Sequence, residues 1–310
     1  MSKTAIFFPG QASQYVGMGQ DLYEASENVR ALYSIASEEI GEDIAKLSFE
    51  GPAEELKRTR FTQPAILLHS LAVLTVLEDT LPEFDFACGH SLGEYGALAV
   101  TGVLTFEDAI KAVVKRAALM EEACVANPGT MAAVMGLTEE QIGDVCNKAS
   151  AKGVVIPANY NSKIQIAVSG DVSAVEEAAK LAKEAGAKRA LMLEVGGAFH
   201  SPLMASATDG MKSYLDGMEF SAPKQPVVAN VTAEPVTEPS QIRELLVKQI
   251  TAPVRWYQTM QYLAANNVTT VIEVGPGKVL AGLAKRDMRP EKSINLDKLS
   301  DIEALGATVG

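Results

Sequence analysis

A serine between two glycines is the clearest candidate for chemistry in this sequence. Residues 86–100 read FACGHSLGEYGALAV: a short apolar run, a Gly-x-Ser-x-Gly pattern around Ser91, then small and apolar residues typical of a buried helix. In the order strand, turn, helix, this pattern predicts a nucleophile elbow, whose glycines allow a sharp turn that exposes the serine hydroxyl. The helix N-terminus would also stabilise a developing oxyanion. The alternative interpretation is a serine exposed in a tight turn.

A nucleophilic serine needs a general base, and the sequence has three histidines, His69, His90 and His200. His90 adjoins Ser91, and neighbouring side chains on a strand or tight turn diverge. His69 lies in an apolar run, where a hydrogen-bonded core histidine is expected. Elimination leaves His200, in the glycine-rich loop 196–202, as the predicted base. The alternative is a histidine in a surface loop.

An acid that would orient His200 is not apparent. Hydrolases with this elbow carry an Asp or Glu between the serine and the histidine in chain order. Asp171 and Glu194 occupy that interval, but both fall in or beside a separate folding unit described below. We therefore expect a Ser-His dyad in which a neutral group, such as a backbone carbonyl, orients the imidazole.

An arginine at the margin of an apolar helix face is the third candidate. On the helix predicted after Thr105, Arg116 falls at the edge of the apolar face. Its guanidinium could bind an anion, extend to water, or pair with Glu107 or Glu121, and the pattern favours none of these. If the anion is a substrate, that substrate carries a carboxylate. The apolar positions of this face are 109, 110, 113, 114, 117 and 120.

The elements that would position these residues alternate between strands and helices. Thr105 and Asp108 form a capping-box-like helix start. Alternation of this kind predicts an α/β fold with a parallel sheet covered on both faces. The predicted strands are 4–8, 84–88, 227–230 and 270–274, and the later helices are 240–250 and 257–265.

Between about residues 128 and 194 the pattern becomes more compact. Four strands and two helices follow in the order β-α-β-β-α-β, which is typical of a ferredoxin-like unit. We therefore predict a discontinuous α/β domain, 1–126 and 197–310, with a ferredoxin-like insertion at 127–196. A cleft between the two would bind the substrate. The predicted strands are 130–135, 153–158, 164–169 and 188–194, and the helices start at Thr138 and span 172–185.

Composition narrows the class of protein. The 310 residues carry a net charge of -12, which disfavours binding to nucleic acid or an anionic membrane. The N-terminus lacks the pattern of a signal sequence, and the apolar run 65–77 is shorter than the ~20 residues of a membrane span. We expect a cytoplasmic protein and, by default, a monomer. Cys88, Cys124 and Cys146 form no C-x-x-C pair, so neither a disulfide framework nor a thiolate metal site is predicted.

Six motifs in chain order resemble the malonyl-CoA:acyl carrier protein transacylases and the acyltransferase domains of fatty acid and polyketide synthases. The resemblance runs from residue 4 to about residue 285. The motifs are FPGQ at 8–11 with Ser13 and Gln14, Thr62-Gln63-Pro64, GHSLGEY at 89–95, Arg116 with Met120, GAFHSPLM at 197–204, and EVGPGKVL at 273–280.

The resemblance implies an α/β-hydrolase-like large subdomain with a parallel sheet and an inserted ferredoxin-like small subdomain. It also implies an activity in fatty acid biosynthesis, the transfer of malonyl from coenzyme A to the phosphopantetheine thiol of acyl carrier protein through a malonyl-serine. No metal or cofactor is implied, and malonyl-CoA is a substrate. The acidic carrier would need a local basic patch, for which Lys188, Arg189, Lys285 and Arg286 are candidates.

The resemblance also implies a role for individual residues. Ser91 would be the nucleophile and His200 its general base and acid. The backbone N–H groups of Gln11 and Leu92 would form the oxyanion hole, and Arg116 would bind the malonyl carboxylate. The remaining implied positions are Gln63 in substrate binding, Phe199 in favouring malonyl over α-branched acyl groups, and Gln249, whose backbone carbonyl would orient His200.

Two departures and three alternatives qualify this hypothesis. The family usually has glycine where Ala12 and Ala117 stand, so each adds a methyl group near the expected acyl site. A serine thioesterase or carboxylesterase would share Ser91 and His200 but would have no use for Arg116. A trans-acting polyketide acyltransferase would differ only in its carrier partner. A non-catalytic carrier-binding module would not need the Ser, His and Arg set.

Overall fold

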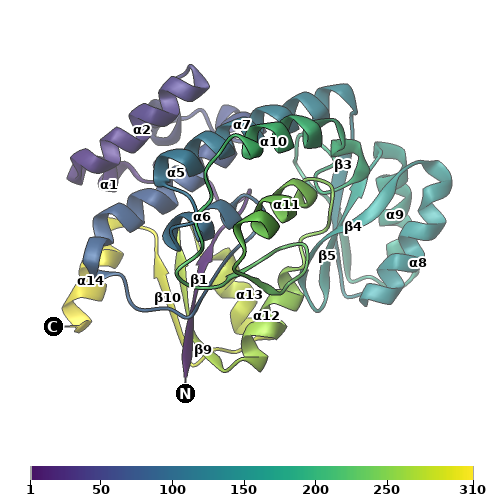
Figure 1. Cartoon of the computed structure of the whole chain (residues 1–310). Coiled ribbons are helices and arrows are strands. Elements are labelled where there is room, and N and C mark those ends of the chain that lie inside the picture. Colours follow the sequence, from purple (N-terminus) through teal and green to yellow (C-terminus); the bar gives the residue numbers. More distant parts are fainter. Residues whose placement is uncertain (1, 310) are drawn as a thin grey trace.

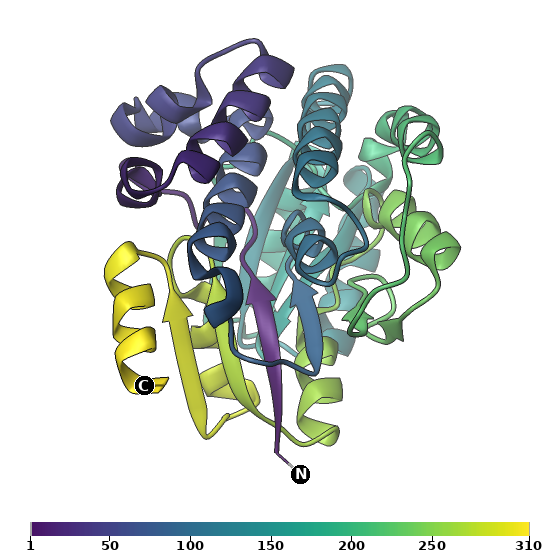
Figure 2. The same cartoon turned by 60° about the vertical axis from the view of Figure 1, so that its left-hand side comes forward.

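The computed structural model describes residues 2–309 and contains two sheets of different kinds (Figure 1). The larger sheet has the strand order β10-β9-β1-β2-β7-β8, and its pairs are parallel except for β7 with β8. Figure 2 shows β1 in the middle of this sheet and β10 toward the C-terminal helix. The strands are β1 (Lys3–Phe8), β2 (Phe86–Gly89), β7 (Val227–Val228), β8 (Pro235–Val236), β9 (Val268–Val274) and β10 (Lys292–Leu296).

Helices cover both faces of the larger sheet, which confirms the predicted α/β class. In chain order they are α1 (Gln20–Ala25), α2 (Glu27–Ile40), α3 (Ile44–Glu50), α4 (Ala53–Leu56), α5 (Thr59–Leu77), α6 (Gly93–Val100), α7 (Phe106–Ala126), α10 (Ser206–Asp216), α11 (Pro239–Gln249), α12 (Trp256–Ala265), α13 (Val279–Asp287) and α14 (Leu299–Val309).

Strand β1 is apolar from Ala5 to Phe8, where both of its faces are buried. Ile6 and Phe8 point into the core shared with α5, α6 and α7. Ala5 and Phe7 point to the opposite face, where α12 and α13 pack. The Phe7 ring meets the Trp256 ring edge-on, with their centroids 5.1 Å apart. The central strand is therefore fixed from both sides, and its carboxyl end has a defined position next to that of β2.

Helix α5 is buried over most of its length in the core of the larger subdomain. It is longer than the apolar run at 65–77 suggested, and its 19 residues meet the length and composition of a membrane span. However, 83% of its most apolar window is buried inside the structure. His69 on this helix is fully buried, and its Nε2 lies 2.7 Å from the carbonyl oxygen of Asp297. The expectation of a hydrogen-bonded core histidine is confirmed.

The smaller sheet is antiparallel and has the order β4-β5-β3-β6. Helices α8 and α9 pack on it around a separate apolar cluster, on the right of Figure 1. This is the predicted ferredoxin-like arrangement. The capping box at the start of α8 is also present, because Thr138 and Gln141 bond reciprocally. The elements are β3 (Thr130–Met135), α8 (Glu139–Ala149), β4 (Val155–Ser162), β5 (Gln165–Gly170), α9 (Val172–Glu184) and β6 (Arg189–Met192).

Several elements differ from the sequence prediction for physical reasons. Strands β8 and β10 and helices α10, α13 and α14 were not predicted. Strand β10 lies at the edge of the sheet, with a half-buried, partly polar sequence that lacks an apolar run. Strand β7 ends at Val228, before the predicted residue 230, because Ala229 hydrogen-bonds to Glu234 in a turn. Strand β6 ends two residues early, at Met192.

Strand β4 also links the smaller sheet to the larger subdomain. The amide of Tyr160 donates to the carbonyl of Val254 at 2.9 Å, and the amide of Val254 donates to the carbonyl of Ala158 at 2.8 Å. Val254 follows the end of α11, so the two parts are joined by backbone hydrogen bonds as well as by the connecting chain. The boundaries 1–126, 127–196 and 197–310 stay predictions.

Candidate active site

Ser91 occupies a strained turn between β2 and α6. Its φ of 53° lies in the left-handed region, which a non-glycine residue adopts only at a cost. A Cβ on Gly89 would lie 2.0 Å from the backbone of Gly93, and a Cβ on Gly93 would lie 2.2 Å from the carbonyl oxygen of Phe8. Both positions therefore require glycine. The turn has the geometry of the predicted elbow.

The hydroxyl of Ser91 faces His200. Ser91 Oγ lies 2.8 Å from His200 Nε2, and His200 Nδ1 lies 2.8 Å from the backbone carbonyl oxygen of Gln249. A carbonyl oxygen can only accept, so Nδ1 carries the proton and Nε2 is free to accept one from the serine. The structure thus brings together the predicted nucleophile, the predicted base and the predicted orienting carbonyl.

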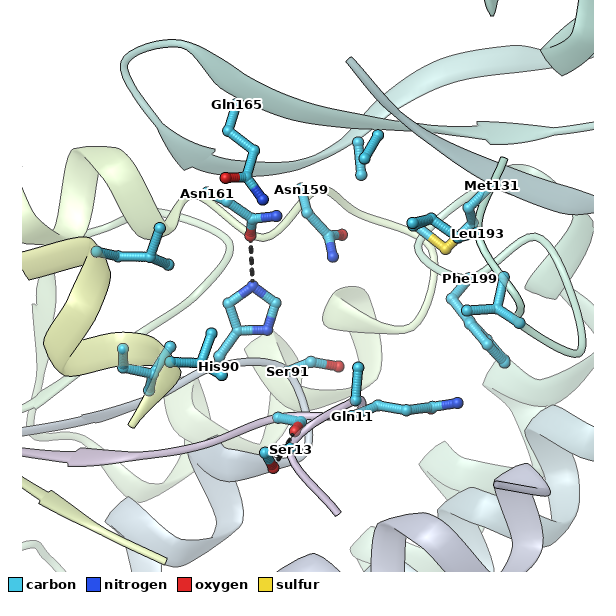
Figure 3. Close-up of a pocket in the computed structure, with 18 of the residues that line it drawn as sticks. Gln11, Ser13, His90, Ser91, Met131, Asn159, Asn161, Gln165, Leu193 and Phe199 are labelled. Atoms are coloured by element: carbon cyan, nitrogen blue, oxygen red, sulfur yellow. Dashed lines mark hydrogen bonds between the residues drawn. The ribbon is translucent and has the colours of Figure 1, made fainter. Parts of the chain in front are cut away.

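Burial keeps this imidazole neutral. His200 is only 3% exposed, and desolvation, together with the nearby Arg116 charge, lowers its pKa to about 3. A neutral imidazole is the form that accepts a proton, so the site holds its base ready at neutral pH. His90 points elsewhere, because its Nε2 bonds to Asn161 Oδ1 at 2.8 Å (Figure 3).

Neither acid in the interval between serine and histidine orients His200. Asp171 lies in the smaller subdomain, where its Oδ2 accepts a hydrogen bond from the amide of Val154. The Glu194 side chain is 88% exposed and pairs with Lys57. The backbone carbonyl of Gln249 occupies the position at His200 Nδ1 where a hydrolase would have an Asp or Glu.

Arg116 lies at the nucleophile rather than at the surface. Its guanidinium is fully buried and donates to Gln63 Oε1 at 2.5 Å, Ser91 Oγ at 3.0 Å and Gln249 Oε1 at 2.9 Å. Glu107 and Glu121 pair instead with Lys111 and Arg58. Within residues 2–309 no carboxylate lies within ion-pair distance of the guanidinium. A buried cation surrounded only by neutral oxygens is suited to binding an anionic group.

A cavity of about 480 Å³ opens above Ser91 between the two subdomains. Figure 3 shows Gln11, Ser13 and Ser91 on one side and Asn159, Asn161 and Gln165 of the smaller sheet on the other. The apolar end is lined by Met120, Met131, Leu193, Val195 and Phe199.

Two amides next to Ser91 have no acceptor. In the part of the chain that the structure describes, the backbone N–H groups of Gln11 and Leu92 donate no hydrogen bond. Amides in this state can stabilise an oxyanion that forms on a substrate carbonyl. No group of three His, Cys, Asp or Glu side chains that could hold a metal ion occurs among the described residues.

Two site residues, Glu94 and Asn230, were not predicted. Asn230 Oδ1 accepts the Ser91 amide at 2.7 Å, and its Nδ2 donates to the Gly89 carbonyl at 2.6 Å. Glu94 Oε2 accepts from Gln249 Nε2 at 2.7 Å and from the Asn230 amide at 3.1 Å. Glu94 stands in the GHSLGEY motif, and Asn230 follows β7 at the end of the VVAN sequence. Nothing in the sequence indicates the partners of either side chain.

All four candidate docking residues are exposed. Arg286 lines the cavity itself, and Lys285 is exposed next to it on α13. Lys188 and Arg189 are exposed at the start of β6. The structure therefore places two of the four candidates on the helix that borders the cavity.

Comparison with known proteins places the chain in a family. The model of the acyl transferase domain matches residues 6–301, so the protein belongs to the acyl transferase domain family. Curated relatives include the malonyl CoA-acyl carrier protein transacylases of Bacillus subtilis and Staphylococcus aureus. They are 44% and 41% identical, each over 98% of this chain, and the matches cover 96% and 98% of the relatives.

Solved structures of the same kind are similar over the whole chain. An acyl carrier protein S-malonyltransferase from Vibrio cholerae is 42% identical with a TM-score of 0.92, covering 98% of this chain and all of that one. A malonyl-transacylase in complex with the acyl carrier protein of a type II polyketide synthase is 38% identical with a TM-score of 0.93, covering 99% of this chain and all of the matched one. The predicted family and two-subdomain fold are confirmed.

Because His200 is neutral, the acylation rate of Ser91 should depend little on pH. An ordinary histidine would lose about tenfold in base activity between pH 7 and about pH 5.5. Because its pKa is lowered to about 3, His200 should keep the single-turnover acylation rate of Ser91 within about twofold over that range. Rapid-quench mass spectrometry of the acyl-enzyme measures the rate. A tenfold fall with circular dichroism unchanged would contradict the assignment.

The same lowered pKa affects stability with a definite sign. The unfolded chain binds a proton on His200 below pH about 6.5, and the native state does not until about pH 3. The contribution of the neutral His200 imidazole to the free energy of unfolding is therefore fully present above pH 6.5 and declines as the pH falls toward 3.

Ala12 generates a prediction on stability. It lines the cavity with a φ of 79°, a conformation that favours glycine, whereas Ala117 is fully buried in the core. Ala12→Gly should raise the free energy of unfolding by about 0.5–1 kcal/mol, because relief of strain exceeds the entropy cost of glycine. Ala31→Gly, on the exposed face of α2, is the matched control and should lower it by about 1 kcal/mol. Urea midpoints that fall for both variants would refute the expectation.

Proposed function

We propose that this protein transfers malonyl from coenzyme A to the phosphopantetheine thiol of acyl carrier protein, through a malonyl-Ser91 intermediate, in fatty acid biosynthesis. The observation that carries the proposal is the buried guanidinium of Arg116, 3.0 Å from the hydroxyl of Ser91 and partnered only by neutral oxygens. A thioester with a terminal carboxylate satisfies both groups at once. The names of the curated relatives support the same substrate.

The first half-reaction builds the acyl-enzyme. Ser91 Oγ attacks the thioester carbonyl of malonyl-CoA while His200 Nε2 accepts the hydroxyl proton. The amides of Gln11 and Leu92 stabilise the oxyanion of the tetrahedral intermediate. The intermediate collapses, the carbon–sulfur bond breaks, and His200 returns the proton to the coenzyme A thiolate. The carrier thiol then attacks malonyl-Ser91, and the same groups act in reverse.

Arg116 changes partners in this mechanism. In the free enzyme its N–H groups bond to side-chain oxygens of Gln63, Ser91 and Gln249. A malonyl carboxylate would replace some of these oxygens with a bidentate ionic pair, which is stronger than the hydrogen bonds to uncharged oxygens that it displaces. Release of the Ser91 hydroxyl from Arg116 would leave it free for His200. Phe199 would crowd a methyl group on the α-carbon of a branched substrate.

The remaining expectations become parts of this proposal. The enzyme would need no cofactor, would act as a cytoplasmic monomer, and would dock the acidic carrier near Lys285 and Arg286. A carrier from polyketide synthesis is the second candidate, because a similar structure contains such a carrier with its malonyl-transacylase. Transfer rates to the fatty acid and polyketide carriers, compared at equal concentration, distinguish the two.

The nucleophile and the carboxylate clamp can be tested together by intact-protein mass. Brief incubation with malonyl-CoA should add one malonyl group to the wild type and none to Ser91→Ala. Loss of charge-assisted hydrogen bonds in Arg116→Ala should slow malonylation by roughly 10- to 100-fold or more.

The matched control for the arginine is Lys111→Ala on the surface of the same helix, which should label like the wild type. Acetyl-CoA serves as the control for the carboxylate. Equal labelling by acetyl-CoA and malonyl-CoA, unaffected by Arg116→Ala, would refute malonyl specificity. Hydrolysis of acyl-CoA without a carrier would instead support a thioesterase.

A further inference from the structure

The mechanism above leaves one buried carboxylate at the site without a role. Glu94 is 2% exposed and stands in the first turn of α6, directly after the elbow. Its Oε2 accepts from the Asn230 amide and from Gln249 Nε2. These two partners hold the Ser91 backbone and the His200 ring in place.

A single amide side chain connects this carboxylate to Arg116. Gln249 Oε1 accepts from Arg116 Nη2 at 2.9 Å, and Gln249 Nε2 donates to Glu94 Oε2 at 2.7 Å. The amide therefore points its oxygen at the cation and its nitrogen at the carboxylate. Opposite charges on Arg116 and Glu94 favour this orientation.

Apart from Arg116, the titratable groups around Glu94 carry no charge at neutral pH. Arg116 faces it from α7, the Cys88 thiol from β2, and the Tyr95 hydroxyl from its own helix. Burial raises the pKa of the Cys88 thiol well above its usual value and also raises that of Tyr95. His200, reached through Gln249, is neutral because its pKa is lowered to about 3. Arg116 and Glu94 are thus the two groups of this set that can be ionised together.

We propose that Glu94 is the internal counter-charge of Arg116 and takes up a proton when the malonyl carboxylate binds the guanidinium. The inference rests on the proposed malonyl transfer. Two buried carboxylates near one guanidinium cannot both stay ionised at low cost, and the substrate carboxylate makes the direct contact. The balanced step is ionised Glu94, the Ser91 hydroxyl and malonyl-CoA plus one solvent proton, giving protonated Glu94, malonyl-Ser91 and the coenzyme A thiol. The solvent proton goes to Glu94, and the Ser91 proton goes to the thiol through His200.

The pH range of this coupling follows from the state of Glu94 in the free enzyme. Desolvation raises its pKa to about 7, although hydrogen bonds from Asn230 and Gln249 and the Arg116 charge oppose the shift. Below pH 7 the group is already protonated, so malonylation takes up little. Above pH 7 Glu94 is ionised, and the negative charge of the bound malonyl carboxylate would raise its pKa further. Proton uptake should therefore be large near pH 8 and small near pH 6.

The experiment counts protons and adducts on the same sample. Wild-type enzyme is mixed with malonyl-CoA in weak buffer with a pH indicator, and malonyl-Ser91 is quantified by mass. The protons released by ionisation of the coenzyme A product are determined by titrating free coenzyme A and are subtracted from the measured change. We expect uptake of about one proton per adduct at pH 8 and about a quarter or less at pH 6. An adduct without proton uptake at either pH would overturn the inference alone. Failure to form the adduct would overturn the proposed function with it.

Glu94→Gln is the matched variant, because its amide oxygen can still accept from Asn230 and Gln249 while the charge is removed. Its proton uptake per adduct should be close to zero at both pH values. Uptake equal to that of the wild type would assign the proton to another group and refute the role of Glu94. The wild-type measurement at two pH values decides the question even if this variant does not fold.

Discussion

The burial of one positive charge, on Arg116, constrains more of this structure than any other interaction. A fully desolvated guanidinium is costly unless oxygens surround it. Its three acceptors come from separate elements: Gln63 from α5, Ser91 from the elbow, and Gln249 from the end of α11. These elements must pack so that their few polar side chains meet at one point. The apolar character of α5 and α7 elsewhere holds them at that point.

The chemistry of the site depends on keeping charge scarce. His200, the proposed base, is neutral because it is buried, and a carbonyl orients it where an acid would add a second charge beside Ser91. Arg116 and Glu94 are separated by the amide of Gln249, so their charges compensate without direct contact. On the proposed mechanism, the carboxylate of malonyl would alter this balance when it binds Arg116.

Local patterns predicted most of the fold and part of the site. The elbow was predictable because the backbone passes too close to Gly89 and Gly93 for any larger residue. His200 was predictable because the sequence has only three histidines and the other two could be set aside. Arg116 could not be resolved from periodicity, which gives its angle on α7 but not what α5 and α11 bring to face it. Glu94 and Asn230 were missed for the same reason, since their partners are distant in sequence. Strand β10 was missed because an edge strand needs no apolar run.

The hydrogen bonds between β4 and Val254 have a mechanical consequence. Val254 follows shortly after Gln249, whose carbonyl holds the imidazole of His200. If the smaller sheet moved away from the larger subdomain, it would either break these hydrogen bonds or displace the chain from Gln249 to Val254, and with it the carbonyl that orients His200. Movement of the smaller sheet is therefore coupled to the position of the carbonyl that accepts from His200 Nδ1.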